Sequence, residues 1–441
     1  MPNLLDASFL KWFYPGMRIK RWLILLMLGV ALMGLGIAYF LREVYVSYTF
    51  PREVYYLTLQ FLPREARGAL FMTVATGLIL FSVWQLNRSL LSAFMPPGRE
   101  ESLVNIIYNH RYLRRGPRIV AIGGGTGLST LLRGLKEYTG NITAVVTVAD
   151  DGGSSGRLRR ELGILPPGDV RNCIAALADA EPLVTKLFQY RFSEGSGLEG
   201  HSFGNLFIVA MSGVTGNFEE AIRETSRVLA VRGQIMPSTL ANVTLCARTD
   251  DQETILGESR ITESGRRIQE VFLEPPNVQA YPEAVQAILD ADMIVIGPGS
   301  LFTSVLPNLL VEGIRKALFA SPAPKVYVCN VATQHGETDS FSVADHLATL
   351  ERHVGKRLVD VVLANSNVSD TLPREWRSEP VRVDGAAAVN GARLLLADVI
   401  SEENRYRHDP KKLAAALMRI YYERQRITEE APAQSTPAGV V

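Results

Sequence analysis

The stretch "RIVAIGGGTGLSTLLRGLK", Arg118 to Lys136, decides the fold class of this chain. Its apolar start, Ile119–Ile122, predicts a buried strand, the glycines predict a tight turn, and the leucine spacing from Leu128 onward predicts an amphipathic helix. Glycine lets a backbone turn with positive φ and approach an anion without a Cβ in the way. The start of the following helix adds unpaired N–H groups and the positive end of a dipole. The stretch therefore predicts either a phosphate cradle or a purely structural strand-to-helix turn.

The glycine spacing matches neither common phosphate-binding pattern. Gly123 and Gly125 fit the dinucleotide fingerprint G-x-G-x-x-G, but Leu128 stands in the place of the third glycine. The Walker pattern fails because its terminal Lys-Ser/Thr pair is missing. What the loop holds must therefore be argued from its place in the fold.

Strand and helix patterns alternate along the chain after this stretch. Further buried strands are predicted at Ile142–Val148, Met293–Ile296, Val326–Cys329 and Val359–Leu363. Helices are predicted at Leu128–Tyr138, Val170–Ala178, Phe218–Leu229, Pro282–Leu289, Leu309–Phe319 and Val343–Arg352. The alternation predicts an α/β fold with a doubly wound, Rossmann-like and mostly parallel sheet.

The composition divides the chain into a membrane part and a nucleotide-binding part. We predict these segments: 1–94, a transmembrane hairpin; 95–116, a linker; 117–405, a nucleotide-binding domain with a β-rich insertion at about 234–273; 406–424, a C-terminal helix; and 425–441, a disordered tail.

The hairpin prediction rests on two long apolar runs, Trp22–Phe40 and Gly68–Leu86, that carry no charged residue. Each is long enough to cross a bilayer as a helix of about 20 residues. Basic residues before the first run and after the second outnumber those between the runs, so the large C-terminal part is expected in the cytoplasm. We therefore predict a two-span protein of the cell membrane.

In a doubly wound sheet, ligands bind outside the carboxyl ends of the strands, so the loops there are the candidate site. After Val148 the sequence reads "ADDGGSSGRLRRELG". Asp150 or Asp151 could hold the ribose of a dinucleotide, or both could hold Mg²⁺ against a phosphate, and Arg157 could clamp phosphate oxygens. Alternatively, the loop is an ordinary turn and the arginine lies on a solvated helix face. Asp169, further on, is interpreted as a helix N-cap.

Three later loops carry polar groups of the same kind. His201 and Asn205 flank a predicted helix start, "GHSFGN", and "GPGSLFTS" from Gly297 to Ser304 has the form of another anion-binding helix start. "NVATQHGETDSFS", from Asn330, offers side chains suited to a base or a sugar. Several anion cradles in one crevice imply a ligand with more than one phosphate.

The composition excludes several other classes of function. The net charge is +1, so no overall field argues for a nucleic-acid partner. The three cysteines are far apart in apolar surroundings, which disfavours a disulfide framework or a zinc site. A serine hydrolase is disfavoured because no G-x-S-x-G elbow follows a strand.

Several motifs together resemble the gluconeogenesis-factor (YvcK-like) branch of the CofD-like superfamily. These are "IGGGTGLSTLLRGLK", "VTVADDGGSSGRLRRELGILPPGDVRNCIAALAD", "GLEGHSFGNLFI", "VRGQIMPSTLANVTL", "VIGPGSLFTSVLPNLL" and "VYVCNVATQHGETD". The resemblance runs from about Pro117 to Val399, outside the hairpin. It implies a Rossmann-like protein that binds UDP-sugars such as UDP-N-acetylglucosamine and that is needed for gluconeogenic growth, cell shape and wall synthesis. It also implies a nucleotide site; the positions we assign to it are Gly124, Gly125, Thr126, Gly127, Leu128, Ser154, Arg157, His201, Asn205, Gly299, Ser300, Asn330 and Gln334, with Asp150 and Asp151 able to hold Mg²⁺.

Two functions of different classes follow. The first is a membrane-tethered nucleotide-sugar sensor that links carbon metabolism to wall synthesis, without a certain cofactor. The second is a Mg²⁺-dependent transferase of the CofD kind, which moves a 2-phospholactyl group from a guanosine diphosphate carrier to a deazaflavin. The long "GGSSGRLRRELGILPPGD" stretch follows the gluconeogenesis-factor pattern and argues against the second. A hydride-transfer enzyme is a weaker third interpretation. We also expect a homo-oligomer.

Overall fold

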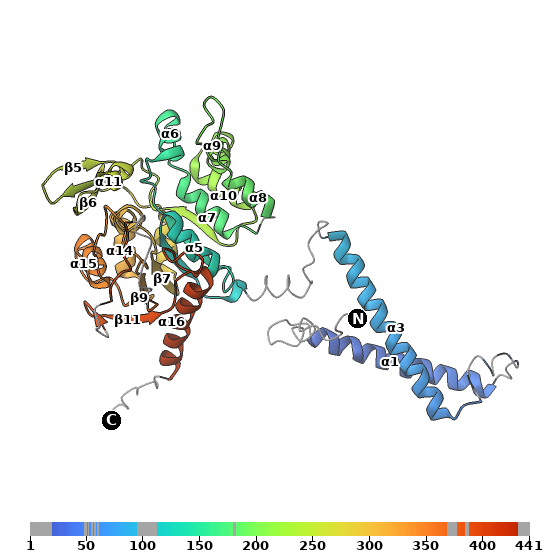
Figure 1. Ribbon diagram of the computed structural model, residues 1–441. Helices are drawn as coiled ribbons and strands as arrows, with labels where there is room; N and C mark the ends of the chain where they lie inside the picture. The colour runs from blue at the N-terminus through green and yellow to red at the C-terminus, as the bar shows by residue number, and fades with distance from the viewer. Residues whose placement is uncertain are drawn as a thin grey trace, which may run out of the picture. The chain divides into compact units, whose positions relative to one another are not determined.

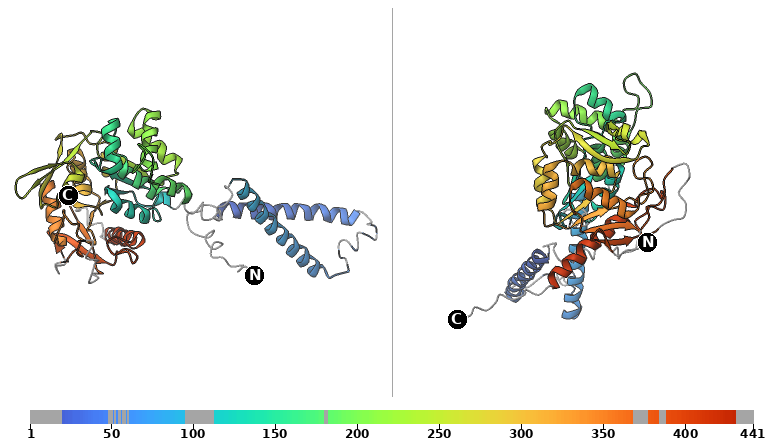
Figure 2. Two further views of the ribbon diagram at one scale, coloured as in Figure 1. Left: turned by 45° about the horizontal axis from the view of Figure 1, so that its top comes forward. Right: turned by 90° about the vertical axis from the view of Figure 1, so that its left-hand side faces the viewer.

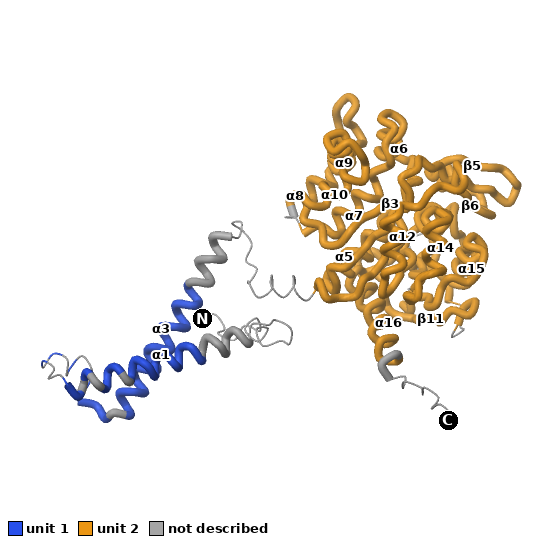
Figure 3. Tube along the Cα trace, turned by 180° about the vertical axis from the view of Figure 1, so that it is seen from behind, with its two compact units in different colours: residues 1–112 blue, residues 113–441 orange. Residues whose placement is uncertain are grey.

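The computed structural model describes two compact units, residues 1–112 and 113–441, which are treated separately below (Figures 1 and 3). The described residues are 20–47, 51, 53, 56, 59, 61–94, 113–179, 182–367, 377–383 and 388–430. Residues 95–112 of the predicted linker 95–116, and residues 431–441 of the predicted tail, lie outside them.

A mostly parallel sheet forms the centre of the second unit. Within the described residues it has eight strands in the order β10-β11-β9-β8-β7-β1-β2-β3, parallel except for the antiparallel pair β10 and β11. Their bounds are β1 Ile119–Gly123, β2 Ile142–Val146, β3 Gln234–Pro237, β7 Met293–Ile296, β8 Lys325–Val328, β9 Val361–Asn365, β10 Ala388–Val389 and β11 Ala392–Ala397. The predicted α/β fold is confirmed, and each of the five predicted strands forms within about two residues of its predicted bounds.

The central strands are apolar throughout because helices cover both faces of the sheet. Every residue of β1 and β7 is buried. The helices are α5 Gly125–Leu135, α6 Gly153–Leu162, α7 Gly168–Leu177, α8 Pro182–Gln189, α9 Phe203–Thr215, α10 Phe218–Val228, α12 Pro282–Leu289, α13 Leu306–Leu309, α14 Glu312–Ala320, α15 Val343–Val354 and α16 Pro410–Glu430. Helix α5 packs against α7 and α16, whereas α12 packs against α14. Helices α6 to α10 gather at one side of the unit (Figure 2).

The β-rich insertion forms, but it begins later than the sequence predicts. Its antiparallel sheet has the order β5-β4-β6, with bounds β4 Thr244–Thr249, β5 Thr254–Leu256 and β6 Ile268–Glu274. Helix α11, Glu258–Ser264, lies between β5 and β6 in the chain. The predicted start at residue 234 is wrong because β3 pairs in parallel with β2 and so belongs to the main sheet.

Two helix predictions also change. The predicted helix Leu309–Phe319 is two helices, α13 and α14, and the chain is extended at Val311 between them. The C-terminal helix begins at Pro410 rather than 406 and continues to Glu430, so residues 425–430 are helical and the prediction of disorder is wrong for them. Leu413 and Leu417 are fully buried, which anchors α16 on the domain.

The first unit contains two long helices, α1 Lys20–Ser47 and α3 Arg64–Phe94. Among the described residues, one helical stretch, Glu65–Gln85, is long and apolar enough to cross a membrane, and none of it is buried inside the protein. The apolar stretch Leu28–Arg42 in α1 is shorter. The two-span hairpin therefore stays a prediction.

Candidate ligand-binding site

The two glycine-containing loops meet because they follow neighbouring strands. β1 and β7 pair in parallel, so the loop after Gly123 and the loop after Ile296 leave the same edge of the sheet. The approach is close enough to require glycine, since a Cβ on Gly127 would lie 2.6 Å from the carbonyl oxygen of Pro298. The Asn308 amide donates hydrogen bonds to the carbonyl oxygens of Gly123 at 3.0 Å and Ser304 at 2.8 Å. Backbone packing and one buried amide thus fix both loops.

A cavity of about 260 Å³ opens beside these loops. It is lined by Gly124, Gly125, Thr126, Gly127, Thr130, Glu258, Pro298, Gly299, Ser300, Thr303, Ser304, Asn330, Val331, Ala332, Gln334, Tyr406, Arg407 and His408. Of the positions assigned from sequence, it brings together Gly124 to Gly127, Gly299, Ser300, Asn330 and Gln334. Leu128 does not line it, because its side chain lies in the core, fully buried. The cavity gathers loops from positions far apart in the chain.

Side-chain hydrogen bonds hold the polar wall of the cavity. The Asn330 amide donates to the Gly299 carbonyl oxygen at 2.9 Å and accepts from the Gly299 N–H at 3.2 Å. Ser300 caps the π-helical turn η3, Leu301–Val305, by accepting from the Thr303 N–H at 3.2 Å. The Ser300 hydroxyl itself donates to Glu337. These hydrogen bonds fix the positions of Gly299 and Ser300 in the wall.

A second cluster, Ser154, His201 and Asn205, lies outside the residues that line the cavity. The Ser154 hydroxyl and His201 Nδ1 are 2.9 Å apart, and the Asn205 amide donates to the Ser154 hydroxyl at 3.1 Å. Burial and then the nearby Arg157 lower the pKa of His201. Arg157 donates to the Glu199 carbonyl oxygen at 2.7 Å, so its guanidinium fastens a loop in this structure. These four positions form a separate polar group between the starts of α6 and α9.

Asp150 and Asp151, the positions assigned to Mg²⁺, both accept hydrogen bonds from backbone N–H groups. Asp150 accepts from the Gly152 N–H at 2.9 Å, and burial raises the pKa of its carboxyl. Asp151 accepts from the N–H of Ser259 at 2.9 Å and from its hydroxyl at 2.8 Å. Among the described residues, no three His, Cys, Asp or Glu side chains are arranged to hold a metal ion. Mg²⁺ binding by these two carboxylates stays a prediction.

Asp169 lies at the glycine turn, which the sequence interpretation missed. It was expected to cap α7, yet it is the second residue of that helix, and Pro167 occupies the N-cap position without a side-chain cap. Its carboxyl instead accepts from the Gly125 N–H, and a Cβ on Gly124 would lie 2.5 Å from its Oδ2. Burial, and then the charge of Asp150, raise its pKa to about 7. The run "PPGD" signalled a helix start but could not show which turn the carboxyl would face.

Glu258 is a second residue that sequence interpretation missed, because it comes from the insertion. It lines the cavity from the first turn of α11. Burial, and then repulsion from Asp150, Asp169 and Glu337, raise the pKa of its carboxyl to about 8. Glu258 is therefore largely uncharged at neutral pH.

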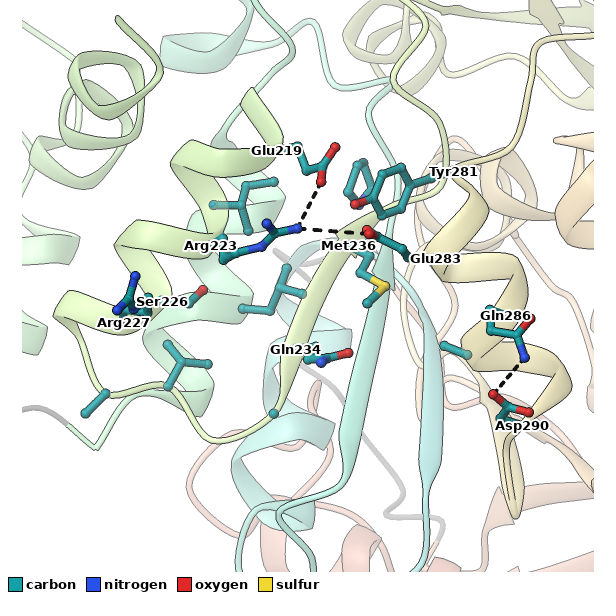
Figure 4. Close-up of a pocket in the computed structure, with 17 residues that line it drawn as sticks. Glu219, Arg223, Ser226, Arg227, Gln234, Met236, Tyr281, Glu283, Gln286 and Asp290 are labelled. Atoms are coloured by element: carbon teal, nitrogen blue, oxygen red, sulfur yellow. Dashed lines mark hydrogen bonds and ion pairs between the residues drawn. The ribbon is translucent and has the colours of Figure 1, made fainter. Parts of the chain in front are cut away.

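A larger cavity of about 600 Å³ lies along edge strand β3, between α10 and α12 (Figure 4). Several of its polar side chains contact one another: Arg223 contacts Glu219 at 3.0 Å and Glu283 at 4.0 Å, and the Gln286 amide donates to Asp290 at 2.8 Å. No position assigned from sequence lines it. The smaller cavity, which eight assigned positions line, is therefore the better candidate.

Comparison with known proteins identifies relatives over most of the chain. The family model described as 2-phospho-L-lactate transferase CofD matches residues 119–401. A Bacillus subtilis protein named gluconeogenesis factor is 48% identical over 314 residues, which are 70% of this chain and 99% of that protein. A crystal structure of a Bacillus halodurans protein superposes with a TM-score of 0.67 at 47% identity, covering 69% of this chain and all of that one.

A third relative extends the likeness into the first unit. A protein from Nostoc sp. is 49% identical over 426 residues, which are 94% of this chain and 93% of its own length. Because that coverage leaves few residues unmatched, most of the N-terminal unit is included. Relatives of the second unit thus occur both with and without such a segment.

Proposed function

The chain belongs to the gluconeogenesis factors of the CofD-like family, and from this premise we propose that its second unit is a regulatory domain that binds a nucleotide sugar. The ligand is of the UDP-N-acetylglucosamine type, and binding links carbon metabolism to cell shape and wall synthesis. The observation that carries the proposal is the cavity in which the backbones of two glycine loops, on neighbouring strands, face the same space.

The charge distribution of the cavity suits a diphosphate at one end. Gly124 to Gly127 supply the N-terminal turn of α5, where the helix dipole and the N–H groups other than that of Gly125, which donates to Asp169, attract anions. Among the described lining residues, Arg407 is the one with a permanent positive charge. A guanidinium binds phosphate oxygens through two N–H groups at once. The diphosphate is therefore assigned to the glycine end, with Arg407 as its cation.

Binding can be measured by isothermal titration of the full chain in detergent with UDP-N-acetylglucosamine. Arg407→Ala should weaken binding by roughly 10- to 100-fold, because a charge-assisted hydrogen bond contributes about 1.5–3 kcal/mol. Arg405→Ala is the matched control, since Arg405 is exposed and does not line the cavity. Absence of heat at millimolar ligand with the unaltered chain would rule out the proposed ligand class.

A CofD-type transferase is the second candidate, because the matching family model carries that name. Such a reaction needs Mg²⁺, which Asp150 and Asp151 would have to bind while their Oδ1 atoms accept hydrogen bonds from Gly152 and Ser259. Incubation of purified protein with a guanosine diphosphate-linked phospholactate, a deazaflavin and Mg²⁺ distinguishes the two candidates. Formation of the phospholactyl product would favour the transferase.

We further propose that the first unit is a two-span membrane hairpin that leaves the second unit in the cytoplasm. Helix α3 supplies one span of sufficient length, and the apolar run in α1 supplies the other. The full chain should stay in the membrane pellet after alkaline carbonate extraction. A protease added to spheroplasts should leave the second unit intact, whereas cleavage there would overturn the orientation.

A further inference from the structure

Helix α11 of the insertion is fastened to the main domain by two acidic side chains. Its own N-cap, Gly257, offers no side-chain cap, and Asp151 fills that role by accepting from the N–H and hydroxyl of Ser259. One turn on, the Thr262 hydroxyl donates to Glu337 Oε1 at 3.2 Å. Both acceptors belong to loops at the carboxyl edge of the main sheet, so α11 is held against that edge.

Glu337 also joins α11 to the polar wall of the cavity. It is 4% exposed and accepts hydrogen bonds from Ser300, from the Gln334 amide at 2.9 Å and from the Thr303 hydroxyl at 3.4 Å. Ser300, Thr303 and Gln334 line the cavity. The buried Glu337 carboxyl therefore contacts both α11 and the polar wall of the cavity.

Glu258 occupies the first position of the helix that these two carboxyls hold. We infer that Glu258 determines ligand specificity by hydrogen bonding to a hydroxyl-bearing part of the ligand, and that Thr262 and Glu337 are its positioning residues. This inference rests on the proposed nucleotide-sugar function and names which part of the ligand the insertion contacts.

The chemistry around Glu258 selects hydroxyl groups over phosphate. The other acidic groups that act on it are Asp150, Asp169, Glu337 and Asp151, so a phosphate placed there would meet five carboxyls. A carboxyl beside a nucleotide crevice is a standard partner for sugar hydroxyls, which donate to it and accept from it. Because burial keeps Glu258 largely protonated, it can do both. The phosphates belong at the glycine end and the sugar hydroxyls at Glu258.

The test compares two probes on the full chain in detergent: UDP-N-acetylglucosamine and inorganic pyrophosphate. Glu258→Ala should weaken binding of the nucleotide sugar at least tenfold and change the affinity for pyrophosphate by less than twofold. The matched control is Glu263→Ala, an exposed glutamate of the same helix, which should change neither. An equal loss for both probes, or no loss for the nucleotide sugar, overturns the inference. If the unaltered chain binds neither probe, it is the proposed function that fails.

A second pair of variants tests the positioning role. Thr262→Val removes the hydroxyl that donates to Glu337. It should weaken binding of the nucleotide sugar about as much as Glu258→Ala does. Thr262→Ser keeps the hydroxyl and should restore affinity. Thermal unfolding of both variants shows whether the fold is kept. Equal affinity of the Val and Ser variants for the nucleotide sugar would show that Thr262 does not position Glu258.

Discussion

Gly127 shows how one missing side chain determines the shape of the site. A Cβ there would meet backbone atoms, the carbonyl oxygen and carbon of Pro298 at 2.6 and 2.7 Å and the Cα of Gly299 at 2.9 Å. None of these atoms can move like the end of a flexible side chain. The two loops that form the cavity can approach each other only while this position is glycine.

We therefore predict that Gly127→Ala separates the loops after β1 and β7. Overpacking of this kind costs about 1–3 kcal/mol, and the nucleotide sugar should bind at least tenfold more weakly. Urea unfolding and isothermal titration measure the two effects. Gly213→Ala is the control, because nothing lies within 4 Å of its Cβ position in α9, and it should be neutral or slightly stabilising. Unchanged affinity in Gly127→Ala would contradict the prediction.

The buried carboxyl of Asp169 predicts a pH dependence of stability. In the unfolded chain its pKa is near the usual 3.8, whereas in the folded protein it is about 7. Between these values the folded protein keeps a proton that the unfolded chain has lost, so unfolding releases a proton. The free energy of unfolding therefore falls as pH rises from 5 to 7, by at most about 1.4 kcal/mol per pH unit for one proton.

Urea unfolding at several pH values, for the unaltered chain and for Asp169→Asn, isolates this contribution. The Asn side chain has nearly the same shape and no proton to lose, so the difference between the two proteins should shrink toward low pH and grow toward pH 7. Glu258 acts in the same direction in both proteins, but less in Asp169→Asn, because the charge of Asp169 is one cause of its raised pKa. Parallel pH profiles would show that Asp169 does not titrate in this range.

At the scale of elements, Asn308 connects a helix to the strand below the glycine turn. Its fully buried amide donates to the carbonyl oxygens of Gly123 and Ser304, and the Gly123 oxygen also accepts from the Thr147 N–H at 3.1 Å. Asn308→Ala removes this buried donor and should lower the free energy of unfolding by about 1–3 kcal/mol. Urea unfolding tests this, with Asn404→Ala, at the surface loop before α16, as the comparison. An equal effect of both changes would contradict it.

The elements predicted from sequence are those whose pattern is local. β1, β7 and α12 combine a continuous apolar run or a helical period with a glycine or proline boundary, and their observed bounds agree with the prediction. β3 was misplaced because the run "QIMP" shows that a strand forms but not which strand it joins. That choice depends on β2, distant in sequence.

Part of the candidate site could be predicted because its sequence pattern is also local. Glycine loops after buried strands can be recognised in a sequence, and the cavity gathers eight of the assigned positions. Asp169 and Glu258 could not be recognised, because their roles depend on which turn faces them across the crevice. Ser154, His201 and Asn205 occur in a glycine-rich context like the others, yet they form a cluster of their own.

At the scale of the whole molecule, the second unit depends on its last helix. Leu413, Ala414, Leu417, Met418 and Ile420 of α16 are buried against the domain. Burying a leucine side chain stabilises a fold by about 1.5–3 kcal/mol, whereas the total free energy of unfolding of a domain is about 5–15 kcal/mol. The buried side chains of α16 therefore contribute a large share of the stability of the second unit.

Truncation after Asp409 should therefore unfold the second unit, whereas truncation after Arg424 removes only exposed residues among those whose burial is described, 425–427, and should leave it folded. Circular dichroism and thermal unfolding of the two truncated chains measure this. A cooperative transition in the shorter chain, at the temperature of the longer one, would show that α16 is dispensable.

The cavity is built from both ends of its domain: Gly124 to Gly127 lie just after the first strand, and Tyr406 to His408 lie just before the last helix. During synthesis on the ribosome, the early loop emerges long before its counterpart has been translated. A chain that ends before Tyr406 therefore lacks one wall of the cavity. Such a chain should not bind a ligand that needs both walls, so premature termination would leave no competitor for the finished protein.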